Sequence, residues 1–255
     1  MLTASLLCVS MPAFATIIDV TIDGSDAIFL AGRTDITIPP ASDPWSSPTG
    51  MQRHTWPTPE EIQETLPPII SVTAGDVIRA LDPAVGGISF YNGFGAPLFG
   101  PDGGSGGTTN LSSFGGISGF LSDGLGPLVG VFLDNSIPNG VAPARINFTA
   151  GGIGTDFTSI TPDLGQVFFI GDGVTSANVF QEFIAPTGAT RLALGIPDGF
   201  GFAGVPGAYD DNDGAYRVRI GINEVPTIPE PATLALLTLG FAGIGYKAKK
   251  RATAR

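Results

Sequence analysis

Apolar residues occur in short runs that Gly and Pro interrupt throughout the chain. The 255 residues include 37 Gly and 22 Pro, and the runs between them are rich in β-branched and aromatic side chains. The run Ala215–Ile222 alternates between apolar and basic or small side chains, which is typical of a half-buried antiparallel strand. No convincing amphipathic helical pattern accompanies these runs. The sequence therefore predicts an all-β fold, an antiparallel β-sandwich.

Strands are expected wherever such a run lies between turn residues. The expected strands are Ala27–Ala31, Asp35–Ile38, Ile69–Val72, Asp76–Ala80, Gly87–Tyr91, Leu128–Leu133, Arg145–Phe148, Gln166–Ile170, Phe180–Phe183, Thr190–Leu194 and Ala215–Ile222. A tight turn at Ala74-Gly75 should join the third and fourth. The Gly-rich stretch Gly100–Phe120 lacks the Lys and the strand-then-helix setting of a phosphate-binding loop, so we expect a flexible surface loop there.

The segment Pro39–Pro68 is rich in Pro and polar residues and contains the only His, His54. A bare loop of this length is uncommon, so we expect an irregular extension that packs on the sandwich. The best helix candidate in the folded part is Thr58–Leu66, where Thr58 is the N-cap and Pro59 opens the first turn.

The first 15 residues are apolar and close on Ala13-Phe14-Ala15. A small residue, any residue and a second small residue form the pattern that signal peptidase cleaves. We expect a signal peptide over residues 1–15, cleaved after Ala15. The only Cys, Cys8, lies in this segment, and a lipoprotein signal ending there is disfavoured because Leu7 is too large for the position before the Cys.

The C-terminal 31 residues contain Pro229-Glu230-Pro231, an uncharged apolar stretch over 232–246 and a basic cluster over 247–255. The apolar stretch is shorter than the roughly 20 residues of a membrane-spanning helix, and the basic residues favour a cytoplasmic end. An ordinary C-terminal anchor is one interpretation. In content and order, however, the segment resembles the PEP-CTERM sorting signal of Gram-negative bacteria.

That resemblance implies recognition by an exosortase, an inner-membrane transpeptidase that removes the helix near Pro229, Glu230 and Pro231. The protein would be anchored in the inner membrane only before processing and would then reach the cell surface or the extracellular matrix. Proteins with this signal accompany exopolysaccharide and biofilm production.

The segment between the two signals is strongly acidic. Residues 16–228 contain seven Arg, no Lys and 22 acidic residues, a net charge of −15. This charge argues against a nucleic-acid partner, which requires basic contacts to phosphate. The segment also has no Cys, and its single His lies in the irregular extension, so we expect a binding or structural protein rather than an enzyme.

One loop concentrates oxygen ligands. Asp210, Asp211, Asn212 and Asp213 follow one another between Gly207 and Gly214. Calcium takes six to eight oxygen ligands, and no nitrogen or sulfur ligand of the kind zinc prefers lies nearby. A polar hairpin turn would explain the same residues, so the residues alone leave both interpretations open.

Residues from about Ile69 to Ile222 resemble the calcium-dependent galactophilic lectins, a family of small jelly-roll sandwiches related in shape to galactose-binding domains. The resemblance lies in three stretches: "SVTAGDVI", "FYNGFGAPLFGPDG" and "VPGAYDDNDGAYRVRIG". It implies a Ca²⁺ held by backbone carbonyls of Tyr91 and Ala208 and by side chains of Asp211 and Asn212. The family has an Asp where this chain has Gly204, and Asp198 is the expected substitute.

In this family the metal also binds sugar hydroxyls. The resemblance therefore implies an extracellular polysaccharide as ligand, with Phe200, Tyr209 and Asp210 as candidate sugar contacts; Phe202 is a further aromatic near the loop. The family's His and Gln after the Gly-Pro turn have no equivalent in "GSGGTTNLSS", and residues 16–68 have no family counterpart. The alternatives are a structural matrix protein whose calcium only rigidifies the loop and, less favoured, a glycoside hydrolase.

The predicted organisation thus has four parts: the signal peptide over 1–15, N-terminal strands and a Pro-rich extension over 16–68, a lectin-like sandwich over 69–224, and the sorting signal over 225–255 with its single short hydrophobic helix.

Overall fold

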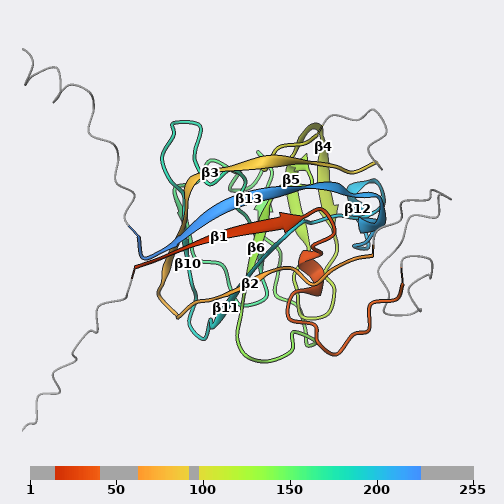
Figure 1. Cartoon of the computed structure of the whole chain (residues 1–255), viewed down its shortest axis with the longest axis horizontal. Coiled ribbons are helices and arrows are strands. Elements are labelled where there is room, and N and C mark those ends of the chain that lie inside the picture. Colours follow the sequence, from red (N-terminus) through yellow and green to blue (C-terminus); the bar gives the residue numbers. More distant parts are fainter. Residues whose placement is uncertain (1–14, 41–62, 92–97, 225–255) are drawn as a thin grey trace, which may run out of the picture. The chain divides into compact units, whose positions relative to one another are not determined.

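The computed structural model describes residues 15–40, 63–91 and 98–224 (Figure 1). In these ranges the chain forms thirteen strands, and its only helices are three single turns of 3-10 helix. The all-β prediction is confirmed. The predicted C-terminal helix, most of the signal peptide and His54 lie outside these ranges.

The largest sheet has five strands in the order β1-β13-β3-β10-β8. Its members are β1 (Thr16–Asp23), β13 (Asp213–Ile222), β3 (Val77–Ser89), β10 (Glu182–Ile184) and β8 (Ser159–Ile160). The predicted alternation of β13 is confirmed. Its apolar face is buried and its basic face is exposed; the buried residues are Tyr216, Val218, Ile220 and Ile222, and the exposed ones Arg217 and Arg219.

Two four-stranded sheets complete the fold. One has the order β2-β11-β6-β9, from β2 (Ile69–Ser71), β11 (Arg191–Gly195), β6 (Val129–Leu133) and β9 (Val167–Phe169). The other has the order β12-β4-β5-β7, from β12 (Ala203–Gly204), β4 (Gly104–Leu111), β5 (Phe120–Leu125) and β7 (Asn147–Phe148). One hydrophobic core includes buried side chains from all three sheets, such as Ile22, Leu192 and Phe120. This arrangement is sandwich-like; the jelly-roll connectivity stays a prediction.

Three pairings differ from the purely antiparallel prediction, because β10 pairs with β8, β12 with β4 and β5 with β7 in parallel. Each parallel ladder is only two residue pairs long, and nothing in the local sequence marks such a contact. The turn at Ala74-Gly75 is present, and Gly75 has a φ of +88°. However, the strands on its two sides enter different sheets, with β2 on β11 and β3 on β13 and β10.

The expectation of a flexible loop over Gly100–Phe120 is wrong, because β4 lies within this stretch and pairs with β5. The Gly residues serve close packing: a Cβ on Gly104 would lie 2.6 Å from the Phe99 ring, and one on Gly107 would lie 2.5 Å from Leu125. The expected strand Ala27–Ala31 is the 3-10 turn η1 (Ile28–Leu30), which is buried on all sides. Asp35–Ile38 forms no strand, and β1 was not foreseen.

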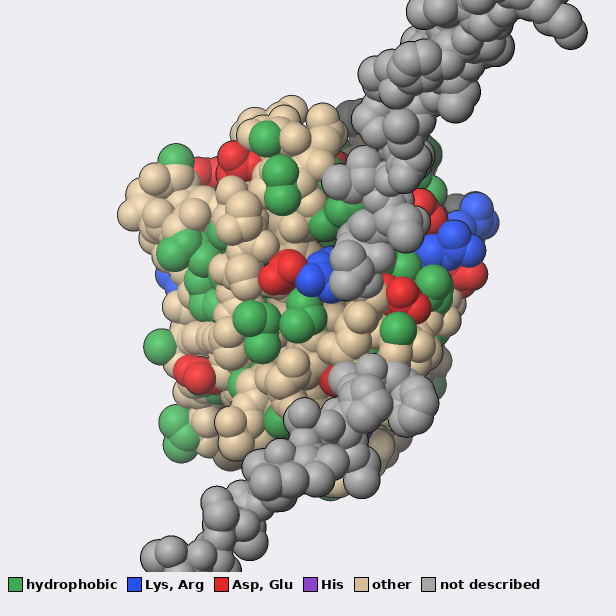
Figure 2. Space-filling model, turned by 90° about the vertical axis from the view of Figure 1, so that its left-hand side faces the viewer, with side chains coloured by type: hydrophobic (Ala, Val, Ile, Leu, Met, Phe, Trp, Pro, Cys, Tyr) green, Lys and Arg blue, Asp and Glu red, His purple; other side chains and the backbone are tan. Residues whose placement is uncertain are grey.

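The expected helix at Thr58–Leu66 falls mainly outside the described residues. Its last part, from residue 63, is not helical, and Thr65 forms a parallel bridge with Asp26. On the face of the molecule seen in Figure 2, exposed apolar side chains are scattered and the few basic side chains do not gather into a patch.

Candidate functional site

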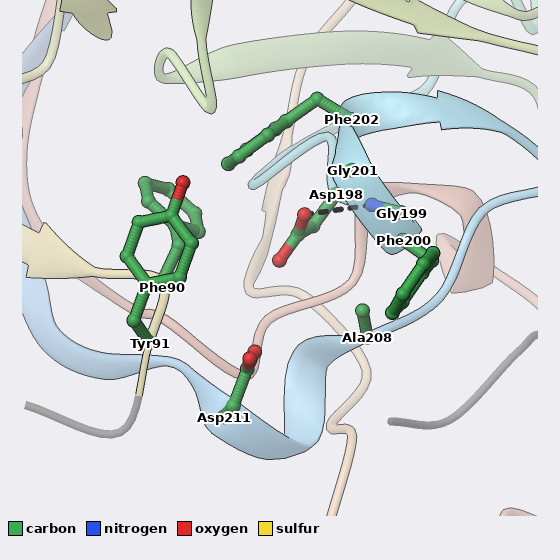
Figure 3. A pocket seen from close by; sticks show the side chains of 9 residues that line it. All are labelled: Phe90, Tyr91, Asp198, Gly199, Phe200, Gly201, Phe202, Ala208 and Asp211. Carbon is green, nitrogen blue, oxygen red and sulfur yellow. Dashed lines mark hydrogen bonds between the residues drawn. The ribbon is translucent and has the colours of Figure 1, made fainter. Parts of the chain in front are cut away.

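Three segments meet at one pocket of about 280 Å³ (Figure 3), and the first is far in the sequence from the other two. The first follows the end of β3, the second contains the 3-10 turn η2 (Phe200–Phe202), and the third contains the 3-10 turn η3 (Tyr209–Asp211) directly before β13. The pocket is lined by Phe90, Tyr91, Asp198, Gly199, Phe200, Gly201, Phe202, Ala208 and Asp211. None of these side chains is basic.

The pocket brings together most of the ligands that the sequence suggested. Tyr91, Asp198, Ala208 and Asp211 all line it, and the carboxyl groups of Asp198 and Asp211 point toward one another across it (Figure 3). Asn212, the residue after Asp211, does not line the pocket, and it is only 1% exposed.

Only one of the three candidate sugar contacts lies at the pocket. Phe200 lines the pocket and is 60% exposed. Tyr209 is fully buried and Asp210 is 2% exposed, and neither lines the pocket. The Tyr209 ring therefore has no face free for stacking on a ligand, and both residues are withdrawn as sugar contacts.

All but one of the polar atoms of Asp198 have a hydrogen-bond partner. Its main-chain N–H donates to the Tyr209 hydroxyl (3.2 Å), its carbonyl accepts from Gly207 N–H (3.0 Å), and its Oδ1 accepts from Gly199 N–H (2.7 Å). Its Oδ2 has no hydrogen-bond partner, although the residue is only 2% exposed. A buried polar atom without a partner is costly and calls for an explanation such as a bound ion.

The side chain of Asn212 shows the same combination. Its Nδ2 donates to the carbonyl of Gly24 (3.0 Å), while its Oδ1 is buried and has no partner. Because the amide nitrogen is fixed by Gly24, the position of Oδ1 is fixed as well.

The acidic groups of the site are in an unfavourable electrostatic environment. Burial raises the pKa of Asp198 well above its usual value, and the charges of Asp211 and Asp210 add to this effect, while the nearby Asn212 side chain and the Gly199 N–H oppose it. Burial, with the charges of Asp210 and Asp213, raises the pKa of Asp211 to about 7. A cation between these groups would favour their charged forms and so oppose both pKa shifts.

The backbone around the pocket contains strained residues. Among the described non-Gly residues, four have a left-handed φ: Asn178, Phe202, Ala208 and Asn223. Asn tolerates this conformation, whereas Phe and Ala rarely adopt it. Phe202 (φ +56°) and Ala208 (φ +60°) both line the pocket, and such strain tends to accumulate at functional sites.

Aromatic rings form the apolar walls. Phe90 packs edge-on against Phe202 with 5.2 Å between ring centroids and stacks on Phe99 at 5.6 Å. Phe90 and Phe202 are buried, while Tyr91 and Phe200 are 46% and 60% exposed. The pocket therefore has an apolar interior and two accessible aromatic rings.

Sequence reasoning missed Phe90 and Gly24. Phe90 adjoins Tyr91 at the end of an expected strand, so its position was a usable signal. Gly24 lies 188 residues from Asn212, and nothing in the sequence indicates that it contacts the loop.

The described residues contain no group of three or more His, Cys, Asp and Glu side chains arranged to hold a metal ion. Any cation here would therefore need amide and backbone oxygens in addition to the two carboxyls. In the same part of the chain, no helix is long and apolar enough to span a membrane. The sorting residues Pro229, Glu230 and Pro231 and the cleavage-site residue Ala13 lie outside the described residues, and Ala15 is exposed at their start.

Comparison with known proteins identifies one segment. Residues 227–251 match the PEP-CTERM protein-sorting motif, which supports an exported protein that an exosortase sorts through a membrane-anchored stage. No curated protein and no solved structure matches the chain, so the resemblance of the central region to the galactophilic lectins has no support from these comparisons.

Proposed function

We propose that this exported, exosortase-sorted protein binds Ca²⁺ in the pocket beside η3 and, through it, an extracellular polysaccharide at the cell surface or in the matrix. The observation that carries the proposal is that two of the four buried side-chain atoms without partners in the described residues, Asp198 Oδ2 and Asn212 Oδ1, belong to candidate ligands; the other two are Ser89 Oγ and Gln181 Oε1. Native proteins leave few such atoms unsatisfied, and a cation bound between the loops that carry Asp198 and Asn212 would offer both oxygens a partner.

The donor set favours calcium. Asp198, Asp211 and Asn212 supply carboxylate and amide oxygens, and Tyr91 and Ala208 are the candidates for backbone carbonyls. Ca²⁺ accepts such mixed oxygen sets in flexible geometries, whereas Mg²⁺ requires a near-ideal octahedron and zinc favours nitrogen and sulfur. When bound, the ion would supply positive charge at the point where three acidic side chains are buried, namely Asp198, Asp210 and Asp211.

The accessible rings support a carbohydrate ligand. Tyr91 and Phe200 lie at the pocket with about half of their surface exposed, as expected of side chains that pack against the apolar face of a sugar ring. Vicinal hydroxyls of the sugar are oxygen donors of the kind that complete a calcium coordination shell. We assign no catalytic step to the pocket.

A glycan array probed with the full chain tests this function. Binding of at least one polysaccharide is expected in millimolar Ca²⁺ and is expected to disappear in excess chelator and in Phe200→Ala. Retention of no glycan would contradict the carbohydrate part of the proposal and favour the second candidate, a matrix protein whose calcium stabilises the loop. If the wild-type chain hydrolyses a polysaccharide and Asp211→Asn does not, the pocket is catalytic and the proposed binding function is contradicted.

A further inference from the structure

Tyr209 is buried behind the pocket rather than in it. Its side chain is fully buried in η3, and its hydroxyl donates to the carbonyl of Ile196 (2.7 Å) and accepts from the N–H of Asp198 (3.2 Å). One hydroxyl group thus fixes the backbone on both sides of Pro197.

A second contact joins the same two segments. Gly207 N–H donates to the carbonyl of Asp198 (3.0 Å). The loop that carries Asp198 and the loop that carries Asp211 are therefore tied by three hydrogen bonds, two of which involve the Tyr209 hydroxyl. Because the two carboxyl groups come from different loops, their separation depends on these bonds.

We propose that Tyr209 is a positioning residue of the cation site: its hydroxyl holds the Asp198 loop against the 207–211 segment and thereby sets the affinity for Ca²⁺. This inference rests on the proposed calcium site.

The chain offers a matched control. Tyr216 is equally buried, and its hydroxyl lies 3.0 Å from the carbonyl of Gly100 and 3.2 Å from that of Gly126. Neither carbonyl belongs to a candidate ligand. Tyr209→Phe and Tyr216→Phe each remove one buried hydroxyl and preserve the ring, so both should destabilise the metal-free protein by a similar amount.

Calorimetric titration of the full chain with CaCl₂ tests the proposal. Tyr209→Phe is expected to weaken Ca²⁺ binding at least about tenfold, the order of effect of losing a residue that orients a metal ligand, and Tyr216→Phe to weaken it less than about twofold. Unchanged affinity in Tyr209→Phe, or equal weakening in both variants, overturns the positioning role. A wild-type chain that does not bind Ca²⁺ overturns the calcium site itself, so the two failures are distinguishable.

If Tyr209→Phe does not fold, hydrogen exchange of the wild-type chain tests the proposal instead. Ca²⁺ is expected to slow hydrogen exchange of the Asp198 amide, which donates to the Tyr209 hydroxyl, and to leave unchanged the exchange of the Gly103 amide, which donates to Gly100. Equal exchange of the Asp198 amide with and without Ca²⁺ overturns the proposal.

Discussion

The side chain of Asp198 combines near-complete burial with an oxygen that no protein group satisfies. In the metal-free protein this arrangement opposes folding, because a buried carboxyl without a full set of partners is less stable than the same group in water. Such a cost to stability points to a ligand that this oxygen binds.

Asp198→Asn should therefore change stability and binding in opposite directions. The amide keeps the shape of the carboxyl but carries no charge, so the metal-free melting temperature is expected to rise or stay constant. Ca²⁺ affinity is expected to fall at least about tenfold, because a charged ligand is lost. Differential scanning calorimetry and calcium titration measure the two effects. The exposed Asp163 provides a control: Asp163→Asn should change stability by less than about 0.5 kcal/mol and leave affinity unchanged.

Asp211 gives the site a defined pH dependence. Its pKa is raised from 3.8 to about 7 by burial and by the charges of Asp210 and Asp213. The folded metal-free protein thus binds more protons than the unfolded chain between these values, so its stability is expected to fall as the pH rises from about 4 to about 7. Denaturant unfolding in chelator at several pH values measures this trend; stability that rises over this interval would contradict the environment described for Asp211.

Calcium should reverse that trend. Binding requires the carboxylate forms of Asp211 and Asp198, so affinity is expected to increase by about tenfold or more per pH unit as the pH rises toward the Asp211 pKa of about 7. An affinity that is constant from pH 5 to 8 would exclude Asp211 as a ligand.

Residues of the site were predictable where they are contiguous. The oxygen-rich loop that holds Ala208, Asp211 and Asn212 is visible in the sequence, because its donors are neighbours. Asp198 could be predicted only through the lectin resemblance, as the substitute for the family's Asp at the position of Gly204. The environments of Tyr209 and Asp210 were not predictable, since exposed and buried side chains of a short acidic loop have the same sequence pattern.

At the scale of elements, the loop between β1 and η1 supports the site through a hydrogen bond to the side chain of Asn212. Gly24 accepts a hydrogen bond from Asn212 Nδ2, and its own N–H donates to the carbonyl of Gly214 (3.0 Å) at the start of β13. The N-terminal segment, which the lectin resemblance does not cover, is therefore part of the structural frame of the pocket.

Gly24→Ala tests this link. A Cβ at this position would lie 2.9 Å from the Cβ of Asn212 and 3.3 Å from Ile88 Cγ2, so Asn212 must move. A loss of about 1–3 kcal/mol in unfolding free energy is expected, together with weaker Ca²⁺ binding. Gly140→Ala is the control, because nothing lies within 4 Å of its Cβ position. Unaltered calcium affinity in Gly24→Ala would show that the N-terminal segment does not support the cation site.

Strand prediction succeeded for β13, which is buried on one face, and for β6 and β9, which are buried throughout, but it missed β1 and β4 and misassigned the run Ala27–Ala31. β13 alternates, so its period identified it. The run Ala27–Ala31 is buried throughout, and a short apolar run of this kind is ambiguous by periodicity alone. β4 was missed because its Gly residues read as a loop, whereas they permit close packing against Phe99 and Leu125.

At the scale of the whole molecule, the sorting motif and the pocket lie in separate parts of the chain. Residues 227–251 match the sorting motif, which supports export and exosortase sorting, while the pocket lies in the described region before residue 225. Replacing both Pro229 and Pro231 by Ala is expected to leave the C-terminal segment attached and the protein in the membrane fraction, with Ca²⁺ affinity unchanged. Cell fractionation with an antibody to the folded region measures this; normal release of the variant would contradict recognition through these residues.

Thermal unfolding of the full chain in millimolar Ca²⁺ and in excess chelator tests the central claim most directly. At a free Ca²⁺ concentration about 100 times the Kd, binding stabilises the folded state by about 2.7 kcal/mol, which corresponds to a rise of roughly 5–10 °C in melting temperature for a chain of this size. The account predicts this rise in the wild-type chain and a rise at most about half as large in Asp198→Asn, whose Ca²⁺ affinity is at least about tenfold lower. The same melting temperature with calcium and with chelator would contradict it.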